Sequence, residues 1–258
     1  MKRILLLGGT SESRWISRML IERDLQVIGS VTTSSARQLF DKEVQDVMVG
    51  KFTSESLQDF LRDQRIEMVL DATHPFAAQI SKNAIEVCDA CHVQYIRYER
   101  PSLRDHLPHD RFTWVASLEA AALALSREAG NILVATGAKN LAPFLNDVLR
   151  NRTFFRLLPT ELGRSRATEH GLGERVWWDN PNPDKESVRS FLQVKAIQAA
   201  VVKDSGPQGI SLMLMELCPP MGIRLFVLER PYLNYPLVCS SAQELQSSLN
   251  LQQTCANP

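Results

Sequence analysis

The chain has 258 residues, a length that suits one large α/β domain or two smaller ones. Its 29 lysines and arginines balance 29 aspartates and glutamates, so no net charge draws it to nucleic acid or to an anionic membrane surface. An anionic ligand must therefore be bound by a local basic cluster. All apolar runs are far shorter than the roughly 18 residues of a membrane span, which predicts a soluble, cytoplasmic protein.

The five cysteines have no disulfide-like spacing, which is typical of a reducing compartment. Cys88 and Cys91 form C-D-A-C beside His92, but no second pair of Cys or His follows at the distance of a zinc finger. We therefore expect no metal site and interpret these thiols as packed helix residues.

Strand and helix periods alternate from the start of the chain. Strands are predicted at 3–7, 27–31, 68–70 and 93–96, and helices at 12–23, 53–64 and 76–91. A charged stretch with prolines at 99–114 is expected to be a long surface connection. Strictly alternating strands and helices predict a parallel sheet that is covered by helices on both faces.

The same alternation returns in the second half. Helices are predicted at 118–129, 140–149, 185–194 and 207–217, and strands at 132–135, 154–158, 199–202 and 224–228, with a polar connection at 163–174. We predict an α/β fold of two Rossmann-like parallel-sheet lobes with the active site in the cleft between them. Residues 1–116 would form the cofactor-binding lobe, and 117–258 a lobe that contributes to the cofactor and substrate cleft.

The first strand ends in the turn Gly8, Gly9, Thr10 and Ser11 ahead of a predicted helix. Missing side chains let a ligand approach the backbone, and the unpaired N–H groups of a helix N-terminus favour a pyrophosphate. Thr10 and Ser13 stand where G-x-G-x-x-G has its second and third glycines, so a purely structural turn is the alternative.

The segment after the second strand has hydroxyls and an arginine where NAD-selective sheets have an acid. The residues concerned are Thr32, Thr33, Ser34 and Arg37. Because an acid there would repel a 2′-phosphate, we expect NADPH as the cofactor, with NADH as the alternative. A polar loop with helix caps is the competing interpretation.

Polar residues also follow the strand at 68–70. Asp71, Thr73 and His74 precede Pro75, which suits the first turn of a helix, so they are expected to face the crevice at the carboxyl ends of the strands. Asp71 and Thr73 are candidate cofactor contacts. His74 is a candidate proton donor or substrate contact, although a lone histidine is more often structural and a bound water is an alternative donor.

Several segments occur in the order found in the precorrin-6A reductase family of cobalamin biosynthesis, which the chain resembles nearly end to end. They are LLLGGTSES, VTTS, DATHPFAAQIS, YIRYERP, VATG, VVKDSG and ERP. The resemblance implies a reduced nicotinamide cofactor between two Rossmann-like lobes and reduction of a double bond in a contracted tetrapyrrole. It adds Thr136, Gly137, Ser205 and Gly206 as candidate cofactor residues. The chain departs from the family pattern at Asp204 and Pro207, near Leu214 and at 178–183.

The implied substrate has many carboxylates, so the basic residues at or after predicted strand ends are candidate substrate contacts. They are Arg97, Arg100, Arg104, Lys139, Lys203 and Arg230, with ordinary surface cations as the alternative. Hydride transfer mainly requires the protein to position donor and acceptor. The Tyr-x-x-x-Lys pair of short-chain reductases is absent, which argues against a carbonyl reductase.

Other functions stay open from the sequence. A reductase of another acidic substrate fits the same cofactor residues, and a non-catalytic dinucleotide sensor could share the first lobe. The expected partner is a tetrapyrrole polycarboxylate, either metal-free or containing cobalt, and the expected assembly is a monomer or a small homo-oligomer.

Overall fold

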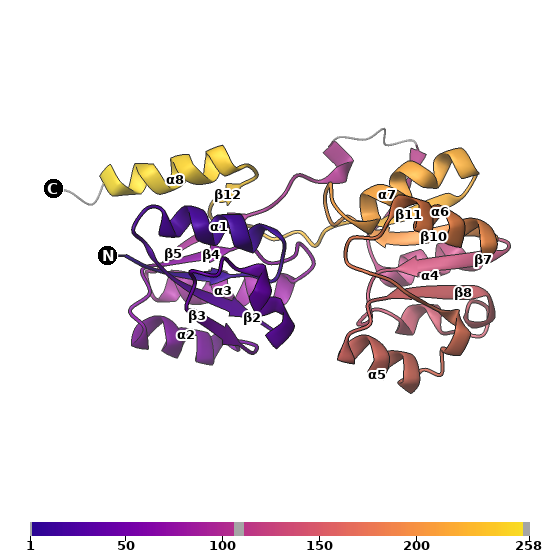
Figure 1. Cartoon of the computed structure of the whole chain (residues 1–258), viewed down its shortest axis with the longest axis horizontal. Coiled ribbons are helices and arrows are strands. Elements are labelled where there is room, and N and C mark those ends of the chain that lie inside the picture. The colour runs from indigo at the N-terminus through magenta and orange to yellow at the C-terminus, as the bar shows by residue number, and fades with distance from the viewer. Residues whose placement is uncertain (1, 106–110, 255–258) are drawn as a thin grey trace. The chain divides into compact units, whose positions relative to one another are not determined.

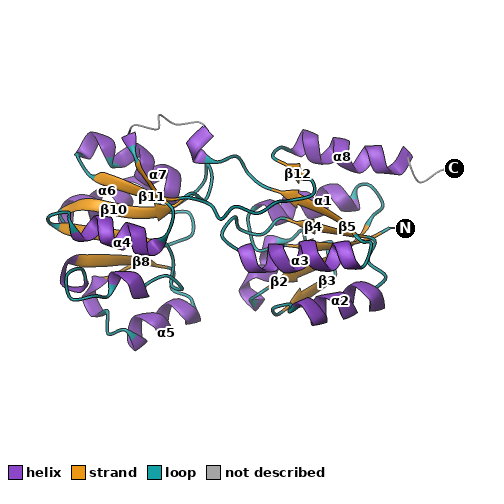
Figure 2. Cartoon of the chain, turned by 180° about the vertical axis from the view of Figure 1, so that it is seen from behind, coloured by secondary structure: helices purple, strands orange, loops and turns teal. Residues whose placement is uncertain are grey.

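The computed structural model describes residues 2–105 and 111–254. The chain forms two compact units, Met1–Arg100 with Pro231–Pro258, and Pro101–Arg230. Each unit is built on a six-stranded sheet with helices on both faces (Figures 1 and 2). The sheets contain only parallel strand pairs among the described residues. The predicted fold class of two Rossmann-like parallel-sheet lobes is thereby confirmed.

The first sheet has the strand order β12-β5-β4-β1-β2-β3. Its elements are β1 Arg3–Leu7, α1 Glu12–Ile21, β2 Gln26–Val31, the 3-10 helix η1 Ser34–Leu39, β3 Asp46–Val49, α2 Ser54–Asp63, β4 Met68–Asp71, α3 Ala78–Ala90, β5 Gln94–Tyr98, β12 Val238–Cys239 and α8 Ala242–Thr254. The helix predicted at 76–91 begins two residues later, at Ala78, because residues 74–77 form a turn of their own.

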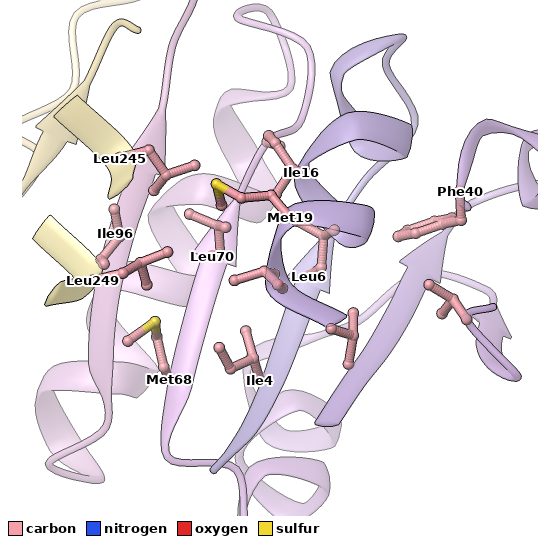
Figure 3. Packing of buried hydrophobic residues seen from close by; sticks show 14 of the residues in the cluster. Ile4, Leu6, Ile16, Met19, Phe40, Met68, Leu70, Ile96, Leu245 and Leu249 are labelled. Carbon is pink, nitrogen blue, oxygen red and sulfur yellow. The ribbon is translucent and has the colours of Figure 1, made fainter. Parts of the chain in front are cut away.

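Side chains of β1 alternate between the two faces of the first sheet, as a doubly covered strand requires. Ile4 and Leu6 pack with α1 and α8, whereas Leu5 and Leu7 pack with α2 and α3. Figure 3 shows Leu245 of α8 beside the β4 and β5 side chains of this core. The C-terminal helix therefore completes the core of the first unit.

The second sheet has the strand order β6-β11-β10-β7-β8-β9. Its elements are β6 Thr113–Val115, α4 Leu118–Ser126, β7 Asn131–Ala135, β8 Thr153–Leu157, α5 Glu161–Glu169, β9 Val176–Trp178, α6 Lys185–Val194, β10 Ile197–Lys203, α7 Ile210–Leu217 and β11 Arg224–Leu228. Helices α6 and α7 pack on one face of this sheet, against Leu133, Ala200, Val202 and Val227.

The division of the chain differs from the expected boundary between 116 and 117. Residues Thr113–Val115 pair with β11, so this strand belongs to the second sheet. Val238 and Cys239 pair with β5, so the chain returns to the first sheet near its end. Both crossings between units fall within a Glu-Arg-Pro sequence, at 99–101 and 229–231. Strands as short as β6 and β12 have too few residues to show a period, which is why the sequence pattern did not reveal them.

Two predicted segments of the second unit are corrected. The helix expected at 140–149 is replaced by a 3-10 helix at Ala142–Phe144 and a turn, in which the Asn146 side chain accepts from the backbone N–H groups of Val148 and Leu149. Most of α5, Glu161–Glu169, lies within the polar connection expected at 163–174, and its N-cap Thr160 accepts from the Gly163 N–H. Within the expected surface connection at 99–114, residues 106–110 lie outside the described residues.

No helix within the described ranges is long and apolar enough to cross a membrane. In the same ranges no group of three or more His, Cys, Asp or Glu residues could hold a metal ion. Cys88 is buried in α3, and burial raises the pKa of its thiol to about 12, as expected for a packed, unreactive cysteine.

Candidate functional site

The glycine turn after β1 has two glycines with different roles. Gly9 has φ of +108° with open space where a Cβ would lie, so it satisfies a backbone requirement and leaves the turn open. At Gly8, an added Cβ would lie 2.6 Å from Cζ of Phe40, and at Gly29 it would lie 2.9 Å from the same ring. Gly8 and Gly29 are therefore required by the packing of Phe40, which the sequence pattern did not reveal.

Ser13 organises this turn from within α1. Its Oγ accepts from the backbone N–H groups of Gly9 at 3.2 Å and Thr10 at 3.4 Å. The Thr10 hydroxyl donates to the carbonyl of Ala72 at 2.9 Å and so ties the turn to the end of β4. The turn is thus held in one conformation by its own side chains, and the hydrogen bonds from the Gly9 and Thr10 N–H groups to Ser13 are long.

Arg100, a predicted substrate contact, forms an ion pair with Glu12 within the first unit. Its Nη2 donates to Oε2 of Glu12 at 2.7 Å, and the Ser11 hydroxyl donates to the same oxygen. Glu12 lies buried in the first turn of α1, where its negative charge alone would oppose an anionic ligand at the helix N-terminus. Arg100 neutralises that charge.

The segment after β2 is exposed. Thr32, Thr33 and Ser34 are exposed, and so is Arg37 in η1. The Arg37 Nη2 donates to the carbonyl of Val47 in β3 at 2.8 Å, which fixes one end of its guanidinium against the neighbouring strand.

Asp71 at the end of β4 is fully buried, with 0% of its surface exposed. Its carboxylate accepts from the Thr73 N–H and hydroxyl, from the hydroxyls of Ser81 and Tyr95, and from Arg97 at 2.8 Å. Burial by itself would raise the pKa of Asp71, but the Arg97 guanidinium and these hydrogen bonds outweigh it and lower the pKa below 3.8. The structure therefore places Asp71, a predicted cofactor contact, in an internal network.

Arg97 is equally buried and belongs to the same network. Its Nε donates to Glu99 at 3.0 Å, and its guanidinium lies 5.3 Å from the ring centre of Tyr235. Burial opposes the charged form, but the carboxylates of Asp71 and Glu99 raise the pKa of Arg97. The predicted substrate contact is in this structure a buried ion-pair partner, and it supports the loop that follows β4.

His74 lies in that loop and is half-buried. Its Nδ1 accepts from the backbone N–H of Phe76 at 3.2 Å, and its carbonyl accepts from the N–H of Ala77 at 2.7 Å. With Nδ1 as an acceptor, the assigned neutral tautomer has its proton on Nε2. The side chain therefore presents a single N–H donor.

A narrow polar recess with no room for a water molecule brings the predicted segments of the first unit together. It lies at the ends of β1, β4 and β5 and is lined by Thr10, Glu12, Ala72, Thr73, Pro75, Arg97, Tyr98, Glu99 and Arg100. The glycine turn, the loop after β4 and the first Glu-Arg-Pro sequence thus meet at one edge of the sheet. Thr32, Thr33, Ser34 and Arg37 are not among the lining residues.

In the second unit, the predicted residues lie at the ends of β7 and β10, which are neighbours in the sheet. Gly137 and Gly206 both have positive φ, +89° and +85°. Lys203 ends β10, and burial together with the nearby charge of Lys139 lowers the pKa of Lys203 to about 8. Thr136 is buried, and its hydroxyl has no hydrogen-bond partner among the described residues.

Asp204 is the centre of a second internal network. Its carboxylate accepts from the Ser102 hydroxyl at 2.6 Å, from the N–H groups of Leu103 and Gly206, and pairs with Arg230 at 3.2 Å. It therefore fixes the first and last segments of the second unit to the end of β10. Arg230, a predicted substrate contact, is part of this anchor, and Asp204 was noticed in the sequence only as a departure from the family pattern.

Arg104 likewise has partners within the second unit. Its Nη1 pairs with Glu229, and its guanidinium lies 5.2 Å from the ring centre of Trp114. Of the predicted substrate contacts, Arg97, Arg100, Arg104 and Arg230 thus pair with carboxylates of their own unit.

The sequence of the chain has counterparts among known proteins. Residues 3–250 match the family described as Precorrin-6x reductase CbiJ/CobK. The chain belongs to this family. The predicted resemblance is confirmed over nearly the whole chain, including the second unit with its departures from the family pattern.

Similar proteins include members named for either form of the substrate. The chain is 30% identical over 253 residues to the cobalt-precorrin-6A reductase of Priestia megaterium, covering 95% of this chain and 97% of the relative. It is 28% identical over 235 residues to the precorrin-6A reductase of Mycobacterium tuberculosis H37Rv, covering 90% and 91%. A solved structure of a CobK precorrin-6A reductase superposes with a TM-score of 0.76 at 22% identity, over 97% of this chain and 96% of that one, and so has the same fold.

Proposed function

We propose that the chain transfers a hydride from NADPH to a ring double bond of precorrin-6A or of its cobalt-containing counterpart. The observation that carries this proposal is the family match over residues 3–250, which makes the chain an oxidoreductase of the precorrin-6A reductase family in cobalamin biosynthesis. Relatives named for both substrates have similar identities to this chain, so the metal-free and cobalt forms are both candidates.

The strand ends of the first unit fit a dinucleotide. Gly9 leaves open space beside the turn, and the Gly9 and Thr10 N–H groups make only long hydrogen bonds to Ser13 Oγ, so an anionic oxygen would share these donors with Ser13. Arg100 cancels the charge of Glu12 at the same helix end. When bound, the reduced nicotinamide supplies the hydride.

The end of β2 supports NADPH over NADH. Thr32, Thr33 and Ser34 offer exposed hydroxyls, and Arg37 offers a guanidinium that is already held by the Val47 carbonyl. A pre-positioned guanidinium loses less entropy when it binds a phosphate, which favours a 2′-phosphate at this place.

His74 is the proposed proton donor or substrate contact. Its Nδ1 accepts from the Phe76 N–H, so the neutral ring would donate a hydrogen bond from Nε2–H to a substrate carboxylate. As proton donor to the ring carbon next to the hydride acceptor it would act as the imidazolium, in which Nδ1 carries a proton and the bond from Phe76 is released. The buried pair of Asp71 and Arg97 holds the loop in which His74 lies. Asp71 and Arg97 thus influence the reaction by positioning the loop that carries His74.

The assay is anaerobic incubation of folded protein with NADPH and each purified tetrapyrrole, followed by absorbance of both chromophores. We expect NADPH oxidation that depends on the substrate, with a matching change in the macrocycle spectrum. Binding of NADPH without turnover of either substrate would instead support a dinucleotide sensor. Turnover of a different acidic substrate alone would support the second alternative.

A further inference from the structure

Tyr235 lies in the segment that brings the chain back to the first unit. This segment follows the second crossing at 229–231 and leads into β12. The carbonyl of Leu237, two residues after Tyr235, accepts from the Arg97 N–H at 2.8 Å, and Val238 is in register with Arg97. The backbone of the returning segment is therefore anchored directly on Arg97.

The ring of Tyr235 covers the guanidinium of the same arginine. Cζ of Arg97 lies 5.3 Å from the ring centre of Tyr235, and the ring is parallel to that of Tyr95 within 3°, with the centroids 6.4 Å apart. An aromatic face attracts a guanidinium, and the attraction is stronger where water is excluded. Because Arg97 is fully buried and the adjacent Tyr235 is partly exposed, the tyrosine ring is part of the cover that keeps water from the guanidinium.

The hydroxyl of Tyr235 is coupled to the same network. Burial raises the pKa of this hydroxyl, and the charge of Arg97 and a hydrogen bond with Ser81 oppose the rise without cancelling it. The tyrosine therefore stays neutral at pH 7. Ser81 also donates to Asp71 at 2.6 Å, so Tyr235 is linked to both members of the buried ion pair.

The guanidinium under Tyr235 holds the loop that follows β4. Nη1 of Arg97 donates to Asp71 at 2.8 Å and to the Thr73 hydroxyl at 3.1 Å. Asp71 in turn accepts from the Thr73 N–H at 2.9 Å, and the next residue is His74. Since interactions between buried charges weaken when water enters, loss of the tyrosine ring should loosen Thr73 and displace His74.

We propose that Tyr235 is a positioning residue that holds His74 in place through Arg97 and Thr73. The ring excludes water from the guanidinium, and the guanidinium fixes the loop. The inference deepens the proposed function and rests on it for the role of His74 in turnover. A misplacement of about 1 Å can slow a positioned reaction about a hundredfold, so the role predicts an effect on kcat.

The first experiment measures the loop in the free protein by hydrogen exchange. Tyr235→Leu removes the ring, Tyr235→Phe retains it, and Tyr232→Leu removes a 91% exposed tyrosine of the same segment. Exchange in the peptide 72–77 should rise about tenfold in Tyr235→Leu alone, with little change in the β1 peptide 3–7. Unchanged exchange at 72–77, or an equal rise in both peptides, would overturn the proposal. Tyr235→Met replaces Tyr235→Leu, with the same expectation, if the latter does not fold.

Chemical modification tests the cover over Arg97. Phenylglyoxal labelling, located by peptide mass spectrometry, should be at least about tenfold faster at Arg97 in Tyr235→Leu than in the parent. Tyr235→Phe and Tyr232→Leu should label like the parent. Arg62, exposed and paired with Asp59, serves as the internal standard in every sample. Continued protection of Arg97 in Tyr235→Leu would contradict the covering role.

Steady-state turnover separates positioning from a structural effect. Tyr235→Leu should lower kcat about tenfold to a hundredfold and change the KM for NADPH less than about twofold, and Tyr235→Phe should retain the parent kcat. In a His74→Ala background the same change should alter kcat less than about twofold, because residues that act through one another are not additive. Additive losses, or a change confined to KM, would overturn the assignment.

The two proposals fail in different ways. Local exchange and Arg97 labelling that respond to Tyr235→Leu, in a protein that turns over neither tetrapyrrole, would support the positioning of the loop and remove the proposed reaction. A working reductase whose loop exchange, Arg97 labelling and kcat do not respond to Tyr235→Leu would remove the positioning role and leave the proposed function intact.

Discussion

At the residue scale, the buried pair of Asp71 and Arg97 explains why the signature of the first unit contains these residue types. The sequence pattern correctly places Asp71 at a strand end. It does not show that both carboxylate oxygens accept hydrogen bonds from other side chains of the first unit, namely Thr73, Ser81, Tyr95 and Arg97. Such networks join residues far apart in the chain, so only the folded structure reveals that candidate ligand contacts are internal partners.

Replacing Asp71 with Asn should destabilise the protein by about 3 to 5 kcal/mol, because it leaves the Arg97 guanidinium buried without this carboxylate. Ser81→Ala, which removes one neutral donor, should cost only about 1 kcal/mol. Urea unfolding at pH 7 measures both. Similar stability of the Asp71 variant and the parent protein would contradict the importance of the pair.

The same residue predicts how stability depends on pH. The pKa of Asp71 is lowered by folding, so its contribution is fully present above the unfolded pKa of about 3.9 and is lost as pH falls through the lower folded value. Urea midpoints measured from pH 6 to pH 2 should therefore fall less steeply in Asp71→Asn than in the parent. Parallel curves would show that other carboxyl groups dominate acid unfolding.

The glycines of the first unit should respond differently to a methyl group. Gly29→Ala places Cβ 2.9 Å from the Phe40 ring and should lower stability by about 1 to 3 kcal/mol, with little change in NADPH affinity once folded. Gly9→Ala meets no neighbour but strains the backbone at φ +108°, in the turn proposed to hold the cofactor, so it should weaken NADPH binding as well. Calorimetric titration and thermal unfolding separate the two effects.

Cofactor preference depends on Arg37. Arg37→Ala should reduce NADPH affinity by roughly tenfold or more and leave NADH affinity unchanged, because a hydrogen bond to a charged group contributes about 1.5 to 3 kcal/mol. Arg62→Ala, which removes an exposed arginine paired with Asp59, is the matched control. Equal losses for NADPH and NADH would place the 2′-phosphate away from Arg37.

At the element scale, strands and helices with clear periods were predictable from the sequence, and short or turn-stabilised elements were not. Helix α6 and strand β11 have the predicted bounds, since their apolar residues repeat at helix and strand spacing. The helix α5 is polar, with few buried residues, and its start depends on the Thr160 cap. The C-terminal α8 was not predicted, although Leu245 and Leu249 are buried.

Helix α8 should be essential to the first unit. Leu245→Ala should destabilise the protein by about 2 to 5 kcal/mol, because the side chain is fully buried against the core of the first sheet. Leu162→Ala, at a position 41% exposed on α5, should change stability by less than about 1 kcal/mol. Unfolding followed by hydrogen exchange would show the loss in β1, β4 and β5, and a loss confined to α8 would contradict this role.

At the scale of the whole molecule, the alternation of elements predicts two parallel-sheet lobes, and the structure confirms them. The course of the chain between the lobes was not predictable, because it depends on the pairing of two short strands, β6 and β12, with distant partners. Predicted site residues do collect at the carboxyl ends of both sheets, as parallel topology requires. Which of them are available to a ligand depends on internal ion pairs that no linear pattern records.

The most direct test of the proposed reaction follows the hydride itself. The protein is incubated anaerobically with NADPH deuterated at both C4 positions and with either precorrin-6A or its cobalt counterpart, and the macrocycle is analysed by mass spectrometry. Direct transfer predicts a reduced macrocycle that is one mass unit heavier than the product formed with unlabelled NADPH. A reduced macrocycle without deuterium, or no reduction of either substrate by folded protein, would contradict hydride transfer from NADPH to the tetrapyrrole.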